Sequence, residues 1–330
     1  MRLRVGGVFV VSAAMLAAGL SGCAEKSSSG NAAESYPQKS IKYIIPFDPG
    51  GESDVTARLQ QGALEDAFGQ SVVVSNREGG GGAVGWSELA NRTKGDGYTL
   101  MGANLPHIVL QPLARDDAGY QTEDIKWAYI FESTPAALIV AKDSPYKTLK
   151  DFVKAAKHKK LTIGGSASFS ANHMGTLALN RAAGIDATYV PFSGTAAVTP
   201  ALLGGQVDAI MSYNTAALDL REKGARVLAV ESDERLDDFP DVPTFAEQGY
   251  DIDQGGAYRG VAVPPDTPKP IVDKVAKVFR KVNEDPKVKK KMDNLGFELV
   301  NMGPEKAKKF TQKRKASARK LLKKFDLLKK

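Results

Sequence analysis

Short apolar runs and longer amphipathic stretches alternate along most of the chain. The run from Ser40 to Pro46 (SIKYIIP) is typical of a buried strand, and the stretch from Asp54 to Phe68 (DVTARLQQGALEDAF) has the apolar spacing of a helix. This alternation predicts α/β layers with largely parallel strands. Further strands are predicted at 71–75, 98–102, 136–141, 161–165, 187–191, 209–213, 227–231 and 258–263. Helices are predicted at 85–92 and 148–157, and they dominate from 270 to the end.

The first two dozen residues follow a different pattern. Two arginines precede an apolar run at 8–20, which is shorter than the roughly 20 residues of a membrane-spanning helix, and Leu-Ser-Gly then leads into Cys23. The pattern predicts a lipoprotein signal peptide at 1–22, with cleavage before Cys23 and diacylation of its thiol. A chance cysteine behind an ordinary signal peptide is the alternative. The Ser/Gly/Ala-rich stretch that follows predicts a flexible tether at 23–37.

Composition extends this prediction. Cys23 is the one cysteine among 330 residues, so lipidation leaves no thiol for a disulfide, catalysis or metal binding. The three histidines are too scattered for a recognisable metal motif, and no cofactor is expected. With 42% hydrophobic and 25% charged residues, the chain is typical of a globular protein and long enough for two domains. We expect it outside the cytoplasm, held on a membrane by its lipid.

The net charge of +7 divides unevenly along the chain. Residues 269–330 contain 21 basic and 7 acidic side chains, whereas the residues before them contain 24 basic and 31 acidic ones. A Lys-rich end is typical of the solvated faces of terminal helices, and a membrane-facing surface is the alternative. Export argues against nucleic acid as a partner.

Candidate ligand contacts lie in loops that lead from strands into helices. In open α/β sheets, ligands bind beyond the carboxyl ends of strands, where helix N-termini offer unpaired N–H groups and partial positive charge to an anion. The loop at 46–54 has two glycines that let the backbone approach a ligand closely, and Asp54 suits an N-cap or a loop-orienting carboxylate. A purely structural turn is the alternative. The candidates in this loop are Phe47, Pro49, Gly50, Gly51, Ser53 and Asp54.

Two further loops have the same character. The stretch at 164–173 contains small residues and three serine hydroxyls before a helix, and the stretch at 191–196 also leads from a strand into a helix. Two asparagines follow strands and could line the same space or serve in turns. The candidates here are Ser168, Ser170, His173, Thr195, Ala196, Asn104 and Asn214. Because the loops are distributed over both halves of the chain, they predict a ligand cleft between two lobes.

The same loops carry the motifs of a known family. Pro-Phe-x-Pro-Gly-Gly-x-x-Asp at 46–54, with Ala-Arg at 57–58, resembles the opening motif of the tripartite tricarboxylate transporter substrate-binding proteins, the Bug-type receptors. Further matches follow in order, and this collinear set is more specific than any single motif. They are Gly-Gln-x-Val-Val-Val at 69–74, Asn-Arg at 76–77, Asp-Gly-Tyr-Thr-Leu at 96–100, Val-Pro-Phe-x-Gly at 190–194, Leu-Gly-Gly-Gln-Val-Asp at 203–208 and Phe-Pro-Asp-Val-Pro-Thr at 239–244.

The resemblance implies a type II periplasmic-binding-protein fold, in which crossing strands join two α/β lobes around a ligand cleft. Lobe one is expected at 38–140 and 258–330, lobe two at 141–257, and the crossings near 136–141 and 258–263. In the family, backbone N–H groups and ordered water at the first loop grip a ligand carboxylate, and loops of the other lobe add contacts. The implied protein is a monomer that hands a carboxylate to large and small permease subunits.

Departures from the family pattern concern lobe two. Gly165, Ala167 and Phe169 occupy places where the family usually has Ser and two Gly. Phe-Ser at 192–193 replaces the usual Tyr-Lys, and Ala197 replaces a usual Pro. Phe169 could narrow the pocket or form an apolar wall. Loss of the Lys removes a positive charge near the cleft, so citrate, with three carboxylates, is not assumed as the ligand.

Other functions fit the sequence less well. The same lobes could serve a sensor whose output partner is not a permease. An exported hydrolase would use Ser168 or Ser170 with His173, but no orienting acid or oxyanion elbow can be identified, so we do not expect an enzyme. Gly-x-Gly-x-x-Gly at 80–85 matches a dinucleotide fingerprint, but a tight glycine turn is the better interpretation in an exported protein without an obvious NAD supply.

Overall fold

The computed structural model describes residues 35–252 and 256–329. The predicted signal peptide at 1–22, the lipidation of Cys23 and all but the end of the predicted tether lie outside the described residues. Among the helices that the structure describes, none combines the length and the apolar character needed to cross a membrane.

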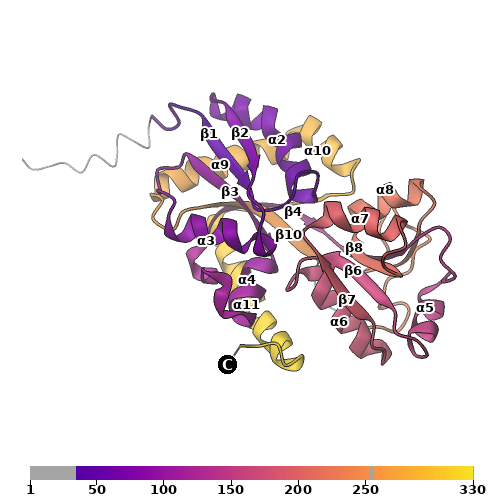
Figure 1. The fold of residues 1–330 in the computed structure, drawn as a ribbon. Coiled ribbons are helices and arrows are strands. Elements are labelled where there is room, and N and C mark those ends of the chain that lie inside the picture. The colour runs from indigo at the N-terminus through magenta and orange to yellow at the C-terminus, as the bar shows by residue number, and fades with distance from the viewer. Residues whose placement is uncertain (1–34, 253–255, 330) are drawn as a thin grey trace, which may run out of the picture.

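A mixed sheet forms the centre of the first lobe. Its strand order is β11-β4-β10-β3-β1-β2, in which β1 runs parallel to β2 and β3, while β10 and β11 run antiparallel to β4. The strands are β1 (Ile41–Ile45), β2 (Val72–Asn76), β3 (Thr99–Leu105), β4 (Lys126–Thr134), β10 (Ala257–Val263) and β11 (Glu298–Met302). Helices α2 (Glu52–Phe68), α9 (Lys269–Glu284) and α10 (Pro286–Asp293) cover one face, and α3 (Ala83–Asn91), α4 (His107–Ala114) and α11 (Pro304–Lys324) cover the other (Figure 1). Short 3₁₀ helices lie at Gly80–Gly82, Asp116–Ala118 and Thr122–Asp124.

A five-stranded sheet forms the second lobe, in the order β7-β6-β8-β5-β9. The strands are β5 (Ala136–Val140), β6 (Thr162–Ser166), β7 (Thr188–Phe192), β8 (Ala209–Tyr213) and β9 (Arg226–Val230). The helices are α5 (Leu149–Ala156), α6 (Ala171–Ala183), α7 (Thr195–Leu203) and α8 (Asn214–Glu222). Residues of α5 and α6 pack on one face of this sheet and residues of α7 and α8 on the other. Figure 1 shows the two lobes side by side, so the predicted two-lobed α/β architecture is confirmed. The prediction of largely parallel strands is wrong, because β10 runs antiparallel to β3 and β4, β11 to β4, and β5 to β8 and β9.

Two stretches of chain connect the lobes. β4 ends at Thr134, and Pro135 leads directly into β5 of the second sheet; the chain re-enters the first sheet at Ala257. Because β5 pairs with β8 and β9, the predicted limit of lobe one at residue 140 is wrong, and its sheet ends with β4. The sequence of β5 (AALIV) could not show this, because a strand buried on both faces has the same apolar composition in either sheet.

The predicted tether is also shorter than expected. Tyr36 is 4% exposed, and its hydroxyl donates to the main-chain oxygen of Gly97 over 2.6 Å. Its ring contacts Phe68 and Tyr98 edge-on, at centroid distances of 6.5 and 5.3 Å. The packed body of the protein therefore includes Tyr36, and the predicted end of the tether at residue 37 is corrected.

The sequence pattern predicted each strand except β4 and β11, and it missed α4. β4 (KWAYIFEST) is buried from Trp127 to Thr134, so apolar and polar residues do not alternate along it. β11 is a short, half-exposed edge strand between basic helices, and α4 contains Pro112. In each case the local pattern that marks a strand or a helix is weak, and tertiary packing decides the conformation.

The hydrophobic core of lobe one continues into lobe two. Met174 of α6 belongs to the same buried cluster as Trp86 and Tyr43 of lobe one, and Phe169 packs against that cluster. The second sheet has a separate buried cluster on each of its faces. Contact between side chains of lobe two and the core of lobe one means that the lobes are closed on each other in this structure.

Gly260 lies where β10 runs between β3 and β4. A Cβ atom there would lie 2.1 Å from the main-chain oxygen of Tyr129 and 2.8 Å from Cα of Ile130. We expect Gly260→Ala to force the strands apart and to lower the free energy of unfolding by about 3 kcal/mol or more, measured by urea titration. Gly62→Ala is the control, because its Cβ would meet no atom within 4 Å and should stabilise helix α2 by about 0.5–1 kcal/mol. Equal effects of the two changes would contradict this account.

Candidate ligand-binding site

A small pocket lies where the two lobes meet. The start of α2, the end of β3 and strand β10 bound it in lobe one, and the ends of β6 and β8 and the start of α7 bound it in lobe two. Its volume of about 20 Å³ leaves room for little more than one water molecule. The lining residues are Phe47, Gly51, Glu52, Ser53, Asn104, His107, Ser166, Gly194, Thr195, Tyr213 and Arg259. Those that the sequence had predicted are Phe47, Gly51, Ser53, Asn104 and Thr195.

The first loop turns sharply before α2. Gly50 has a φ of 78°, in the left-handed region that glycine tolerates, and its N–H donates to Oδ2 of Asp54 over 2.9 Å. Asp54 also accepts from Nε of Arg58 at 3.0 Å and from Nδ2 of Asn76 at 2.9 Å. Burial opposes ionisation of Asp54, but these donors outweigh it and lower the pKa of the carboxyl group. Asp54 therefore braces the loop, while Pro49 and Gly50 are exposed and do not line the pocket.

Lobe one contributes a polar wall and an aromatic wall. Nδ2 of Asn104 donates to Oγ of Ser53 over 3.0 Å, which fixes the first turn of α2 against the end of β3. Phe47 packs edge-on against His107, with ring centroids 5.6 Å apart. Burial, aided by the charge of Arg259, lowers the pKa of His107 to about 3, so the imidazole is neutral. Both of its ring nitrogens lack hydrogen-bond partners among the described residues.

Lobe two approaches the start of α2 through the start of α7. The N–H of Glu52 donates to Oγ1 of Thr195 over 3.2 Å, and a Cβ atom on Gly51 would lie 3.3 Å from the same oxygen. Ser193, just before α7, donates from Oγ to the carboxylate of Asp48 in the first loop. The first and third candidate loops therefore face each other directly across the lobes.

Ser170 and His173 brace the second candidate loop from outside the pocket. Oγ of Ser170 accepts from the main-chain N–H of His173 at 3.1 Å and so caps α6. The ring of His173 stacks on Tyr189 with centroids 4.6 Å apart, and its Nδ1 accepts from the N–H of Phe169 at 3.2 Å. Burial lowers the pKa of His173 to about 4. The serine hydroxyl thus contacts the backbone of His173, in a capping arrangement.

The other candidates of lobe two also lie outside the pocket lining. Ser168 is exposed, and Ala196 is half-buried on α7. Asn214 is buried, and its Nδ2 donates to the main-chain oxygen of Gly296 in lobe one over 2.6 Å. Asn214 therefore links the lobes away from the pocket. Ligand contacts from the residues outside the lining stay predictions.

A buried ion pair at the pocket was not predicted from the sequence. Arg259 of β10 is 3% exposed, and its Nη2 contacts a carboxylate oxygen of Glu52. Its Nη1 donates to Oγ1 of Thr134 over 2.7 Å and lies 3.8 Å from the carboxylate of Glu132. Oγ1 of Thr215 in lobe two donates to the other carboxylate oxygen of Glu52. Glu52 thus joins a cation of lobe one to a hydroxyl of lobe two.

Burial has the largest effect on the pKa values of the two glutamates in this cluster. It raises the pKa of Glu132 to about 8 against the opposing charge of Arg259, and it raises the pKa of Glu52 against the opposing effects of Arg259 and Thr215. Burial also disfavours the charged guanidinium, but the two carboxyl groups outweigh this and raise the pKa of Arg259. Arg259 therefore stays charged, and one ionised glutamate is enough to cancel its charge.

The sequence contains a signal for this cluster. Glu132 directly follows the apolar and aromatic run WAYIF at 127–131, and Arg259 lies among the apolar and aromatic residues of β10 (AYRGVAV). A charge in a buried strand needs an opposite charge or several hydrogen bonds, so two such strands of opposite charge predict a pair. Glu52 gave no such signal, because an acidic residue in the first turn of a helix is common on the surface.

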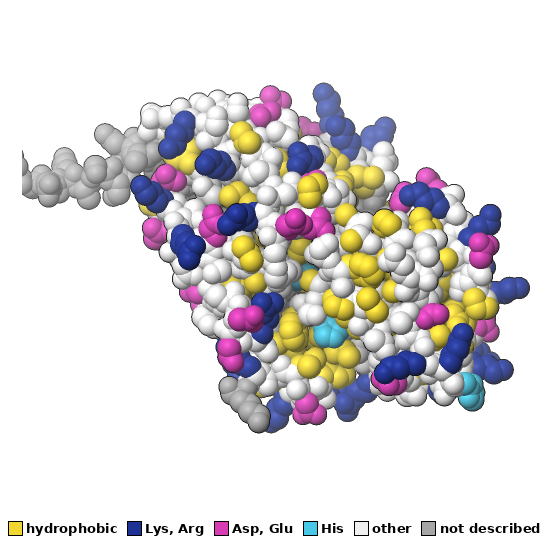
Figure 2. Space-filling model, in the orientation of Figure 1, with side chains coloured by type: hydrophobic (Ala, Val, Ile, Leu, Met, Phe, Trp, Pro, Cys, Tyr) yellow, Lys and Arg dark blue, Asp and Glu magenta, His cyan; other side chains and the backbone are white. Residues whose placement is uncertain are grey.

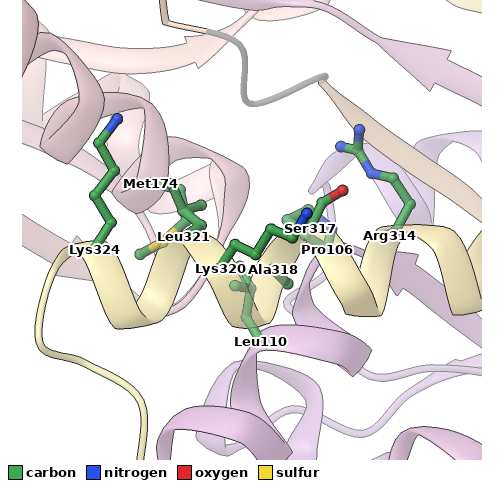
Figure 3. A pocket seen from close by; sticks show the side chains of 9 residues that line it. All are labelled: Pro106, Leu110, Met174, Arg314, Ser317, Ala318, Lys320, Leu321 and Lys324. Carbon is green, nitrogen blue, oxygen red and sulfur yellow. The ribbon is translucent and has the colours of Figure 1, made fainter.

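A second depression lies between the lobes, beside the C-terminal helix. It has a volume of about 300 Å³, and residues of α4, α6 and α11 contribute to its lining. Figure 3 shows Arg314, Lys320 and Lys324 along α11, with Met174 beside Leu321 and Leu110 near Ala318. Apolar side chains also gather at the lower junction of the lobes in Figure 2. The lining of this depression includes none of the predicted site residues.

Residues 56–327 match the family model described as the tripartite tricarboxylate transporter family receptor. The chain belongs to this family. The solved periplasmic binding protein BugD is 28% identical, with a TM-score of 0.84 over 89% of this chain and 100% of its own. MatC from Rhodopseudomonas palustris with bound malate is 27% identical, with a TM-score of 0.81 over 87% and 100%. The R. palustris protein Rpa4515 with adipate is 27% identical, with a TM-score of 0.83 over 87% and 97%.

These similarities confirm the family that the sequence motifs indicated and the two-lobed periplasmic-binding-protein fold. The similarity covers both lobes, since each of the three structures aligns with at least 87% of this chain. The protein is accordingly an extracytoplasmic receptor of the solute-binding type. The sequence match begins within α2 and extends into the last turn of the C-terminal helix and beyond it.

Asp54→Asn removes a charged acceptor from three donors, and we expect it to lower the free energy of unfolding by about 1–3 kcal/mol at pH 7. The folded-state pKa of Asp54 is depressed, so its stabilisation is present above the ordinary value of about 3.9 and is lost as the pH falls through the folded value. Urea titrations should therefore show the difference between wild type and variant shrinking below about pH 4. Asp66→Asn, at an exposed position of the same helix, is the control, and a pH-independent difference for Asp54→Asn would contradict the assignment.

Proposed function

We propose that the protein binds a small carboxylate between its lobes and delivers it to a tripartite tricarboxylate-type membrane transporter. The observation that carries the proposal is the meeting of two helix N-termini from opposite lobes, where the N–H of Glu52 lies 3.2 Å from Oγ1 of Thr195. Helix N-termini favour anions through unpaired N–H groups and partial positive charge. The similar receptors with malate and adipate support a carboxylate as the ligand class.

Ligand uptake requires the lobes to open. The pocket of about 20 Å³ is too small for a carboxylic acid of several carbon atoms. The two connections between the lobes, at Pro135 and Gly256, are the places where a hinge rotation would occur. A ligand that binds the closed form more tightly than the open form shifts the population towards closure.

The proposed cellular arrangement includes a lipid anchor and two membrane subunits. Cys23 would carry the lipid, and the stretch between it and Tyr36 would tether the packed body to the membrane surface. The large and small permease subunits of a tripartite transporter would then receive the ligand. A ligand sensor with the same lobes and a signalling partner is the alternative, and membrane subunits that co-purify with the receptor would discriminate the two.

We also propose that the protein is a binding protein without enzymatic activity. A serine hydrolase would need the imidazole of His173 to accept the proton of a nearby serine hydroxyl. In this structure Nδ1 of His173 accepts from the backbone of Phe169, and Oγ of Ser170 caps a helix. The imidazole of His173 and the hydroxyl of Ser170 therefore hold the local backbone in place and are not arranged as a catalytic pair.

A panel of mono-, di- and tricarboxylates is the direct test. We expect at least one member to raise the melting temperature of the mature protein and to give a saturable signal in isothermal titration calorimetry. At a free concentration of about 100 times its dissociation constant, that ligand should add about 2.7 kcal/mol to the free energy of unfolding. If no member of the panel raised the melting temperature or gave a calorimetric signal, the result would contradict the proposal.

Gly51→Val tests the first loop as a ligand contact. Any Cβ at this position would already lie 3.3 Å from Oγ1 of Thr195 and 3.3 Å from the main-chain oxygen of Asp48. The larger side chain should hold the lobes apart and weaken binding of the ligand at least tenfold, measured by calorimetry. Gly62→Val, within the helix that follows Gly51, has open space around it and should bind as wild type does. Unchanged affinity in Gly51→Val, with a native circular-dichroism spectrum, would refute the assignment.

A further inference from the structure

Glu52 places a carboxylate of the chain itself inside the ligand pocket. It is the first residue of α2, it is 9% exposed, and it belongs to the pocket lining. One of its oxygens contacts Arg259 of lobe one, and the other accepts a hydrogen bond from Thr215 of lobe two. The proposed function, on which this inference rests, assigns a ligand carboxylate the same task of joining the two lobes.

The positively charged side chain of the pocket already pairs with carboxylates of the protein itself. Arg259 and His107 are the basic residues of the described lining, and the imidazole of His107 is neutral. The guanidinium of Arg259 contacts Glu52, lies 3.8 Å from Glu132 and lies over the ring of Tyr213 at 4.9 Å from its centroid. A ligand in this pocket therefore meets helix N-termini and uncharged groups, but no free cation among the described residues.

Donors for an uncharged polar group are present. Nε of Arg259 and both ring nitrogens of His107 are buried without a hydrogen-bond partner in the described structure. An N–H of the guanidinium donates, and a neutral imidazole donates through one nitrogen and accepts through the other. A hydroxyl, carbonyl or amide group of a ligand would satisfy these atoms, which are costly to bury unpaired.

We propose that Glu52 is a specificity-determining residue, which selects ligands with one carboxylate and an uncharged second polar group and which rejects a second carboxylate. Because Glu52 already pairs with the guanidinium of Arg259, a second carboxylate would be buried in a closed pocket with little water and without a cation to pair with. An amide or hydroxyl in the same place carries no such cost. The ligand class is thus narrower than that of a general di- or tricarboxylate receptor.

Matched pairs of ligands test this proposal. Succinate and succinamate, and adipate and adipamate, have equal length and differ by one carboxylate replaced with an amide. We expect the wild-type mature protein to bind each monoamide at least tenfold more tightly than its diacid in calorimetry. Glu52→Gln removes the charge with little change in shape and should reduce this ratio at least tenfold. Glu123→Gln is the control, because Glu123 pairs with Lys315 on the surface of lobe one and should leave the ratio unchanged.

Each outcome is decisive. A wild-type protein that binds the diacids more tightly, or a panel in which only di- and tricarboxylates bind, would overturn the role of Glu52 while leaving the proposed function in place. An unchanged ratio in folded Glu52→Gln would do the same. If that variant does not fold, the relative affinity of the wild-type protein for monoamides and diacids alone decides whether the proposal holds. Absence of binding by any carboxylate would instead overturn the proposed function, and this inference with it.

Discussion

The buried guanidinium of Arg259 is the constraint on which the site depends. A charge in the protein interior is costly unless opposite charges and hydrogen bonds compensate it, and removal of one partner of a buried pair costs several kcal/mol. Arg259 obtains its partners from three places: Glu52 at the start of α2, Thr134 and Glu132 on β4, and the ring of Tyr213 in lobe two. The need to pair one cation therefore holds the first loop, a crossing strand and the opposite lobe in a single arrangement.

The position of this cluster connects it with closure of the lobes. β4 and β10 are neighbours in the first sheet, and both lead into lobe two within a few residues of the charged groups. Rotation about these connections would carry Thr215 and Tyr213 away from Glu52 and Arg259 and would admit water to both charges. Closure removes that water, so the electrostatic balance of the cluster contributes to the free-energy difference between open and closed forms.

Local sequence predicted much of the fold and part of the site. The turn at Gly50 and Gly51 and the polar residue Ser53 could be identified because the signal lies within one loop and the helix that follows it. The lobe boundary could not be identified, because β5 is apolar on both faces and its sequence is compatible with either sheet. The Arg259–Glu52 pair joins residues 207 positions apart. The sequence therefore indicates that Arg259 and Glu132 are charges in buried strands, but it does not show that Arg259 pairs with Glu52.

Two features of the loops limit the positive charge that the cleft offers to a ligand. Ser193 is uncharged, and its hydroxyl donates to the carboxylate of Asp48 in the opposite lobe. Glu52 adds a carboxylate that occupies the one charged guanidinium of the lining. An uncharged Ser193 and a paired Arg259 both leave a ligand with several negative charges without a cation to pair with, and neither alters the helix N-termini at Gly51 and Gly194 that can receive one carboxylate. Backbone amides therefore supply the attraction in this pocket, and the side chains decide how much negative charge it accepts.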